Sequence, residues 1–436
     1  MQEAALERPP DELGTTLDAE LVHHARPLGL GGAHGDMERL GDVAVRVPVC
    51  EQNGRRLLAL GQRVLRHDTT LPAGAAPDIG RSTDPHAAMY GGIYSRRAMR
   101  RPVLVVNAGS TSLKLTAVAI GEESSPVESL EAAPRVAAVG HRIVHGGERL
   151  QEPTLIDRDV VDELEHLVDL APLHNAPAVA AIAAARRALP DLPHVAVFDT
   201  AFHHSLPAVA RTYLLPSRFR ERGIRRFGFH GLSVQWAAER VPVPRLVVCH
   251  LGGGSSITAV LDGRSIDTTM GFTPLEGVPG ATRPGPVDPG SLLYLLREGV
   301  SAAELDRALE HESGLTGLAG TGDVAALERD PSPHAALALD VYAYRVSQAV
   351  AAMAAALGGL DAIVFTGGVG EHSAIVRAAV CRRLGFLGVV VDESANETAT
   401  GEAAVSSGGS TVRVEVVPAR EDVVIARAVR KLLDTD

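Results

Sequence analysis

Lysine is nearly missing from this chain of 436 residues: only Lys114 and Lys431 occur, and arginine supplies every other basic side chain. Aromatic residues are also scarce, at 3%, so a core must be built largely from alanine, valine and leucine. Acidic residues outnumber basic ones and the net charge is −11. That balance argues against a nucleic-acid or anionic-membrane partner, because binding to either needs a basic surface.

The cysteines are few, and their spacing does not indicate disulfide pairs. Cys50, Cys249 and Cys381 are odd in number, widely spaced and without a CxxC pair, which is typical of reduced thiols in the cytosol. The sequence has no apolar run long enough to span a bilayer and no signal-peptide pattern. We therefore expect a soluble, cytoplasmic protein without a membrane partner. Its length, with 45% hydrophobic and 22% charged residues, suffices for two domains.

One lysine stands in a segment with a clear pattern. Residues 107–114 read as a strand end, a Gly/Ser turn and the start of a second strand. Backbone N–H groups, the hydroxyls of Ser110 and Ser112 and the ammonium of Lys114 would point at one spot, which suits a phosphate. An ordinary hairpin with a surface lysine is the alternative.

The pattern recurs along the chain. Residues 104–118 resemble residues 246–260, and residues 362–370 add a third apolar strand with a glycine turn. Recurrence of one such unit predicts two related α/β halves, each with a phosphate-holding turn toward a shared cleft. Chance similarity of two short hairpins is the alternative.

The first hundred residues differ from the rest. Residues 1–100 are rich in Gly, Pro, His and Arg without a sustained period, so we predict a poorly ordered extension. A small accessory domain, or a true start near Met99, are alternatives. From Arg101 onward strands and helices alternate, which predicts an α/β fold. The expected helices are 157–170, 176–189, 234–240, 302–312, 335–357, 373–384 and 421–433. The expected strands are 195–198, 246–250, 257–261, 362–365, 389–391 and 412–417.

Several charged side chains in strands or at strand and helix ends are candidate functional residues. Arg142 lies in an apolar strand, Asp199 ends another strand, and Glu421 begins the last helix. Each has a structural alternative: an ion pair, a turn cap or a favourable helix dipole. His230 is, taken alone, more often a hydrogen-bonded core histidine. Together with Arg283 and the glycine turns, however, they supply the charge neutralisation and positioning that phosphoryl transfer needs.

The motifs in order closely resemble the acetate kinase family, from about residue 102 to the C-terminus. The matching segments are 107–114, 140–147, 171–175, 197–203, 228–231, 250–260, 270–277 and 365–371. The resemblance implies two duplicated ribonuclease-H-like (actin-like ATPase) domains around a nucleotide cleft. Domain I would comprise 101–199 plus 423–436, and domain II 200–422.

The resemblance also implies an activity and roles. The reaction would be ATP plus acetate giving ADP and acetyl phosphate, with Mg²⁺, in a homodimer. Arg142 and Arg283 would hold the carboxylate and the phosphoryl group, His230 would donate to that group, and Asn107 would orient it. Metal contacts would come from Asn107, Asp199 and Glu421. The acyl methyl would be enclosed by Val144, Leu173 and Pro274. The nucleotide and its phosphates would contact Ser110, Ser112, Lys114, His174, His250, Gly252, Gly253, Gly254, Asp323, Gly367, Gly368, Val369 and Gly370.

This chain departs from the family pattern at several nucleotide-side positions. Gly253 stands where the family usually has Asn, and Val324 and Ala325 replace a common Phe-Arg pair. These changes remove polar, stacking and cationic contacts, so they bear on nucleotide affinity. A propionate- or butyrate-preferring acyl kinase, a non-catalytic nucleotide-binding protein and a phosphohydrolase of the superfamily are the alternatives. The Arg142/Arg283 pair favours a carboxylate acceptor over water.

Overall fold

The structure of the chain, a computed structural model, describes residues 100–108, 113–170 and 172–434, without the side chains of 169, 170 and 172–174. The predicted N-terminal extension up to residue 99, Ser110 and Ser112 lie outside this description, as do the side chains of Leu173 and His174. No helix in the described ranges is long and apolar enough to cross a membrane.

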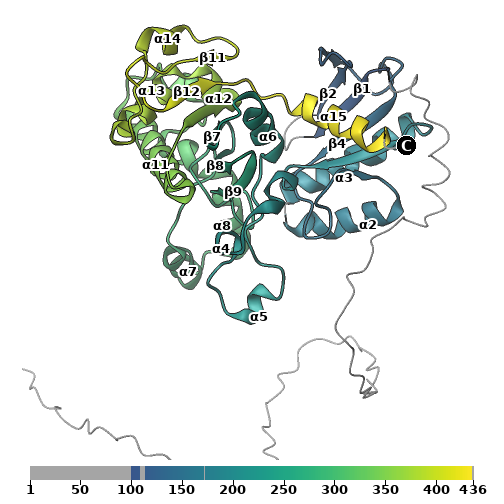
Figure 1. Cartoon of the computed structure of the whole chain (residues 1–436). Helices are drawn as coiled ribbons and strands as arrows, with labels where there is room; N and C mark the ends of the chain where they lie inside the picture. Colours follow the sequence, from purple (N-terminus) through teal and green to yellow (C-terminus); the bar gives the residue numbers. More distant parts are fainter. Residues whose placement is uncertain (1–99, 109–112, 171, 435–436) are drawn as a thin grey trace, which may run out of the picture. The chain divides into compact units, whose positions relative to one another are not determined.

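A six-stranded sheet forms the first half, in the order β3-β2-β1-β4-β6-β5 (Figure 1). Its strands are β1 (Val103–Ala108), β2 (Leu113–Val118), β3 (Ser124–Val127), β4 (Ala138–Ile143), β5 (Thr154–Leu155) and β6 (His194–Phe198). The strands β1, β4 and β6 are parallel, while β2, β3 and β5 pair antiparallel to their neighbours. The central strands are buried apolar runs because helices cover both faces.

A second six-stranded sheet repeats this topology, in the order β11-β12-β10-β7-β8-β9. Its strands are β7 (Arg245–Leu251), β8 (Ser255–Leu261), β9 (Arg264–Thr268), β10 (Ala362–Thr366), β11 (Ala403–Ala404) and β12 (Arg413–Val416). An antiparallel meander, β7-β8-β9, is again followed by two parallel strands, and β11 is again a short antiparallel edge. The two similar sequence segments form β1–β2 and β7–β8, so the predicted duplication is confirmed.

Helices occupy most of the connections. They are α2 (Arg158–His166), α3 (Pro172–Ala188), α4 (Ala208–Arg211), α5 (Ser217–Arg220), α6 (Gly231–Arg240), α7 (Pro289–Arg297), α8 (Ala302–Arg307), α9 (Gly314–Ala319), α10 (Val324–Leu327), α11 (Pro333–Leu357), α12 (Gly367–His372), α13 (Ala374–Arg383), α14 (Glu393–Thr398) and α15 (Glu421–Leu433). Shorter 3-10 turns are η1 (Leu167–Leu170), η2 (Ala201–Ser205) and η4 (Gly385–Leu387), and η3 (Ala308–Glu312) is a π-helical turn.

Each sheet separates two apolar layers. In β1, Val103 and Val105 face α15, whereas Leu104 and Val106 pack with Ala185 of α3 on the other face. This alternation follows from the two-residue repeat of a strand. In the second sheet, β7 and β10 present one face to α11 and the other to α6.

The helices α6 and α15 share one apolar cluster with both sheets. Val234 of α6 and Ile425 of α15 are fully buried in it. Contact with the first sheet is close, because a Cβ built on Gly140 of β4 would lie 2.6 Å from Ile425 and 2.9 Å from Val429. In Figure 1 the yellow α15, the last helix in sequence, accordingly lies against the blue strands β1, β2 and β4. These two helices tie together the elements that carry the charged residues.

Several sequence predictions need correction. No strand forms at 389–391: Val391 makes only an isolated bridge to Ser406, and Val390 N bonds the hydroxyl of Ser410. The glycines after β10 begin α12 directly instead of forming a turn. The expected helices 157–170 and 302–312 change to a 3-10 turn at Leu167 and to a π turn at Ala308. Ser301 caps α8, since Glu304 N donates to Ser301 Oγ at 3.1 Å.

Candidate active site

Neighbouring strand ends of the first sheet carry three of the candidate residues. Asn107 of β1 is in register with Arg142 of β4, and Arg142 with Val197 of β6. Asp199 follows directly after β6. Because parallel strands end at the same edge of a sheet, the sequence places all three side chains together.

Arg142 is the centre of this group. Its Nε lies 3.0 Å from Asp199 Oδ1 and its Nη2 lies 2.6 Å from Oδ2, a bidentate pair. Its Nη1 lies 3.3 Å from Asn107 Oδ1 and 3.1 Å from Glu421 Oε2. Asn107 Nδ2 also donates to Glu421 Oε2, at 3.4 Å. The structural alternative for Arg142, an ion pair, is therefore present, and it is built from the other candidate residues.

Burial and pairing act against each other in this group. Burial raises the pKa of Asp199, and the Arg142 guanidinium opposes that rise. For Arg142, burial alone would lower the pKa, but Asp199 and Glu421 outweigh it and the pKa is raised. The guanidinium therefore stays charged and holds two carboxylates at one point.

His230 enters the site from α6. It precedes Gly231 in a left-handed conformation, with φ 59°, and Gly231 N donates to Asp199 O at 2.9 Å. A Cβ at Gly231 would lie 2.2 Å from that oxygen, so only glycine permits the approach. His230 Nδ1 lies 3.1 Å from Ser256 Oγ. The helix start thus fixes His230 beside the Asp199 backbone.

A second histidine stacks on the first. The rings of His230 and His250 have centroids 4.1 Å apart, and His250 Nδ1 lies 2.8 Å from Ser233 Oγ. Burial, with the positive charge of Arg142, lowers the pKa of His250 to about 4, so this ring is neutral at pH 7. Ser233 and Ser256 were not predicted, and hydroxyls that orient histidines leave no spacing signal in a sequence.

Arg283 approaches from the second half. Its Nε lies 2.9 Å from Glu310 Oε2, and both side chains are largely buried. A Cβ on Gly254 would lie 3.4 Å from both Arg283 Nη1 and His230 Nε2, so these two nitrogens border the same glycine. Glu310 lies in the π turn η3 and was not singled out in the sequence.

Two glycine segments lie beside these residues. A Cβ on Gly252 would lie 3.9 Å from Gly368 N and from His250 Nε2. Gly253 and Gly368 are exposed, and Gly367 has φ 77°. Val369 is half-buried and Gly370 buried. The structure therefore brings the 252–254 and 367–370 backbones together.

The remaining phosphate-side candidates are less tightly held. Lys114 is exposed and lies in register with Asn107. Asp323 is exposed and caps α10, with Ala325 N donating to it at 3.0 Å. A Cβ on Gly322, the residue before Asp323, would lie 2.6 Å from Ala281 Cβ, and Ala281 N donates to Gly253 O at 3.0 Å. The loop before Asp323 therefore lies next to the 252–254 glycines.

An apolar cluster adjoins the charged residues. Val144, Phe229 and Met270 form it, all buried. Pro274 is also buried, but it is not among the residues of this cluster. Phe229 and Met270 were not singled out in the sequence, although both lie inside the recognised motifs. Asn175 braces this wall by accepting from His145 N at 3.2 Å and donating to His145 O at 3.1 Å.

Metal binding was predicted at Asn107, Asp199 and Glu421. Their oxygens converge on one guanidinium and form the hard-oxygen donor set that Mg²⁺ prefers. Within the described ranges no cluster of three or more His, Cys, Asp or Glu residues is arranged to hold a metal. Two carboxylates and one amide fit a Mg²⁺ that keeps water and substrate phosphates as its other ligands.

Comparison with known proteins covers both halves. The sequence matches the acetokinase family over residues 127–427. The acetate kinase of Synechococcus sp. (strain JA-2-3B'a(2-13)) is 46% identical over 316 residues, covering 70% of this chain and 78% of the relative. The acetate kinase of Deinococcus radiodurans is 46% identical over 324 residues, covering 71% and 81%.

Solved structures agree. The acetate kinase of Porphyromonas gingivalis superposes with a TM-score of 0.68 at 33% identity, covering 77% of this chain and all (100%) of that one. A propionate kinase from Francisella tularensis subsp. tularensis SCHU S4 gives a TM-score of 0.70 at 31% identity, covering 75% and 98%. The expected pair of actin-like ATPase domains is confirmed by these matches. The chain belongs to the acetokinase family.

Proposed function

We propose that this chain is an acetate kinase, which reversibly transfers the γ-phosphoryl group of ATP to acetate and yields acetyl phosphate and ADP. The observation that carries the proposal is the boundary at the end of β4. Arg142, near the end of β4, lies in the charged group. Val144, just after β4, lies in the apolar cluster with Phe229 and Met270. A short fatty acid needs this combination of a cation for its carboxylate and an apolar wall for its alkyl group.

The transfer is an in-line displacement. A carboxylate oxygen of acetate attacks the γ-phosphorus while the bond to the leaving oxygen of ADP breaks, so charge spreads over the three equatorial oxygens. Arg283 and His230, which border Gly254, supply donors to those oxygens, and Asn107 orients the group. Glu310 holds the Arg283 guanidinium in place. These groups are fixed before the reaction, which is how such sites lower a barrier.

ATP phosphates occupy the glycine segments in this proposal. The 252–254 and 367–370 backbones approach closely and, being glycine-rich, expose N–H groups to an anion. Neutral His250 lies under His230, and Lys114 provides a cation at the β1–β2 turn. Ser110, Ser112 and His174 complete the phosphate side, and Asp323 borders the nucleotide.

Mg²⁺ is held by Asp199 and Glu421, directly or through water, with Asn107 beside them. When bound, the ion neutralises phosphate charge. The Arg142 guanidinium already pairs with both carboxylates, so a Mg²⁺ would use the oxygen lone pairs that these ion pairs leave open. Mg²⁺ prefers oxygen ligands, which these two carboxylates and the Asn107 amide supply.

Domain, subunit and compartment assignments follow. Domain I comprises 101–199 and 423–436 because α15 packs on the first sheet, and domain II comprises 200–422. A homodimer is supported by an exposed apolar stripe on α11: Leu337, Val341 and Tyr344. The cytoplasm is supported by the unpaired, buried thiols of Cys249 and Cys381.

A hydroxylamine trap tests the reaction. Acyl phosphate formed from ATP and acetate, propionate or butyrate is converted to its hydroxamate and quantified. We expect the highest kcat/KM with acetate, lower values with propionate and little product with butyrate. Absence of hydroxamate from all three acids would refute the proposal, and a preference for propionate would correct its substrate.

A further inference from the structure

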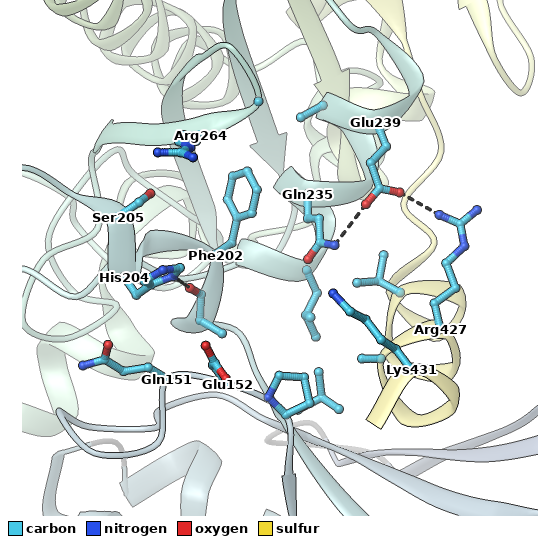
Figure 2. A pocket seen from close by; sticks show the side chains of 18 of the residues that line it. Gln151, Glu152, Phe202, His204, Ser205, Gln235, Glu239, Arg264, Arg427 and Lys431 are labelled. Atoms are coloured by element: carbon cyan, nitrogen blue, oxygen red, sulfur yellow. Dashed lines mark hydrogen bonds and ion pairs between the residues drawn. The ribbon is translucent and has the colours of Figure 1, made fainter. Parts of the chain in front are cut away.

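A large cavity lies on a different set of residues from those assigned to the reaction. Its volume is about 1000 Å³, at the upper end of the size of small-molecule sites. Its walls come from α6, α15, η2, the 151–153 segment and the β8–β9 turn (Figure 2). None of the residues given above for acetate, phosphate, nucleotide or metal lines it.

The cavity has an apolar floor and a charged rim. The floor consists of Val197, Phe202, Leu232, Val424, Ala428 and Leu432. The charged rim carries three cations, Arg264, Arg427 and Lys431, and two carboxylates, Glu152 and Glu239. An apolar body with a polar end would match this lining.

Two of the cations are uncommitted. Arg427 is bound to Glu239 and Glu122, each at 2.6 Å. Among the described residues, neither the Arg264 guanidinium nor the Lys431 ammonium has a hydrogen bond or an ion pair. Figure 2 shows Lys431 extending from α15 into the middle of the cavity, with Phe202 and Arg264 on the opposite wall. Lys431 is one of only two lysines in the chain.

The walls of the cavity continue into the reaction site. Leu232 lies in the first turn of α6, which begins directly after His230. Val424 lies in the first turn of α15, whose first residue is Glu421. Val197 and Phe202 flank Asp199 in sequence. A molecule bound in the cavity therefore contacts elements that carry or adjoin reaction-site residues.

We propose that this cavity is an inhibitory effector site for an amphipathic anion, a carboxylate or phosphate head on an aliphatic or aromatic body. The head pairs with Lys431, with Arg264 as a second cation on the opposite wall, and the body covers the apolar floor. Occupancy separates α6 from α15 and shifts His230 relative to Glu421. Small displacements of such groups lower turnover strongly, so the effector reduces kcat without competing with acetate.

Direct binding is the first test, because it does not depend on turnover or on the proposed activity. Octanoate and octyl phosphate are titrated calorimetrically into the full chain, in the presence of saturating acetate, with octylammonium as the matched cation. We expect one anion per chain and affinity for octylammonium at least about tenfold weaker. The tighter of the two anions identifies the head group. No anion binding, or equal binding of octylammonium, would overturn the proposal.

Charge reversal is the second test. Lys431→Glu should weaken anion binding by about tenfold, because an attraction becomes a repulsion. Arg382→Glu is the matched control: Arg382 is also exposed in the last turn of a helix but lies outside the cavity. Lys431→Gln covers the case in which reversal destabilises α15, and should weaken binding about threefold. Unchanged affinity in both Lys431 variants would contradict the site.

Kinetics separate an effector site from a mere cavity. Saturating octanoate should lower kcat while KM for acetate stays constant, and Lys431→Glu should keep its basal kcat but need about tenfold more octanoate for the same inhibition. Inhibition that acetate relieves would place octanoate in the acyl site instead. Binding without any change in kcat would refute the regulatory part.

Discussion

At the scale of single residues, Arg283 offers the sharpest test of how the transferring phosphoryl group is stabilised. Arg283→Ala should lower kcat by about 100- to 1000-fold, the usual effect of removing one donor to developing charge. KM for acetate should change much less. Steady-state kinetics check this, with Arg382→Ala as the control for loss of a surface arginine. Turnover near the wild-type value in Arg283→Ala would show that Arg283 does not stabilise the transition state.

Substrate size is set by residue 144. Val144 is buried against Phe229 and Met270, so Val144→Ala opens room for about one methylene, worth roughly 1–3 kcal/mol. The ratio of kcat/KM for acetate to that for propionate should fall at least about fivefold. Val139→Ala, in strand β4, which ends just before residue 144, but in a different apolar cluster, should lower stability and leave the ratio unchanged. An unaltered ratio in Val144→Ala would show that the alkyl group lies elsewhere.

Buried histidines predict an acid-sensitive fold. Burial lowers the pKa of His203 to about 4, while an unfolded histidine has a pKa near 6.5. Between these values the unfolded state binds the proton and the folded state does not, so stability falls as pH drops from 6.5 to 4. His203→Gln should reduce this slope by up to about 1.4 kcal/mol per pH unit in urea unfolding. Identical slopes would contradict the assignment.

Much of the site was predictable at this scale because its residues fall at strand ends and helix starts. Arg142, Asp199 and Glu421 follow from apolar runs that end in charge, and the structure joins them in one ion-pair group. Glu310, Ser233 and Ser256 were not predictable. They act by touching another side chain, and such contacts arise only when distant segments fold together.

At the scale of elements, α12 carries a glycine segment of the site and is held by one buried cation. Arg377 of α13 donates to Gly370 O and Glu371 O at 3.0 and 2.9 Å, and to Asn396 Oδ1 at 2.7 Å. Arg377→Met should leave those carbonyls unsatisfied, at a cost of about 1–3 kcal/mol per group. KM for ATP should rise more than kcat falls, while Arg382→Met on the same helix should change neither. A normal KM for ATP would show that α12 is held by other contacts.

Element boundaries followed the sequence where the pattern was long. The helix predicted at 421–433 has those bounds, and the one predicted at 335–357 begins only slightly earlier, at Pro333. The strand predicted at 389–391 is wrong because Gly388, in a left-handed turn, and the start of α14 leave a span long enough for only one isolated bridge. The helix α7 was missed because it buries no residue and so has no core-facing period to detect.

At the scale of the whole molecule, the exposed stripe on α11 predicts the oligomeric state. Leu337, Val341 and Tyr344 follow helical spacing on one face, and α7 adds exposed Leu293 and Tyr294. Val341→Glu should convert a dimer into a monomer in size-exclusion chromatography with light scattering. Ile375→Glu, at an even more exposed apolar position on α13, should remain dimeric. A monomeric wild-type chain would contradict the proposed homodimer.

The duplicated architecture was visible in the sequence because both halves repeat one strand–turn–strand pattern. The apolar cluster shared by the two sheets was not visible in the sequence. The helices α6 and α15 that form it are far apart in the chain and meet only when it folds. The cavity beside these helices was hidden for the same reason.

The most direct test of the central claim is the stoichiometry of one reaction. ADP and acetyl hydroxamate are measured together from ATP and Mg²⁺, with and without acetate. An acetate kinase forms them in equal amounts and forms almost no ADP when acetate is left out. Formation of ADP at the same rate without acetate, with no hydroxamate, would contradict the account and show that water is the acceptor.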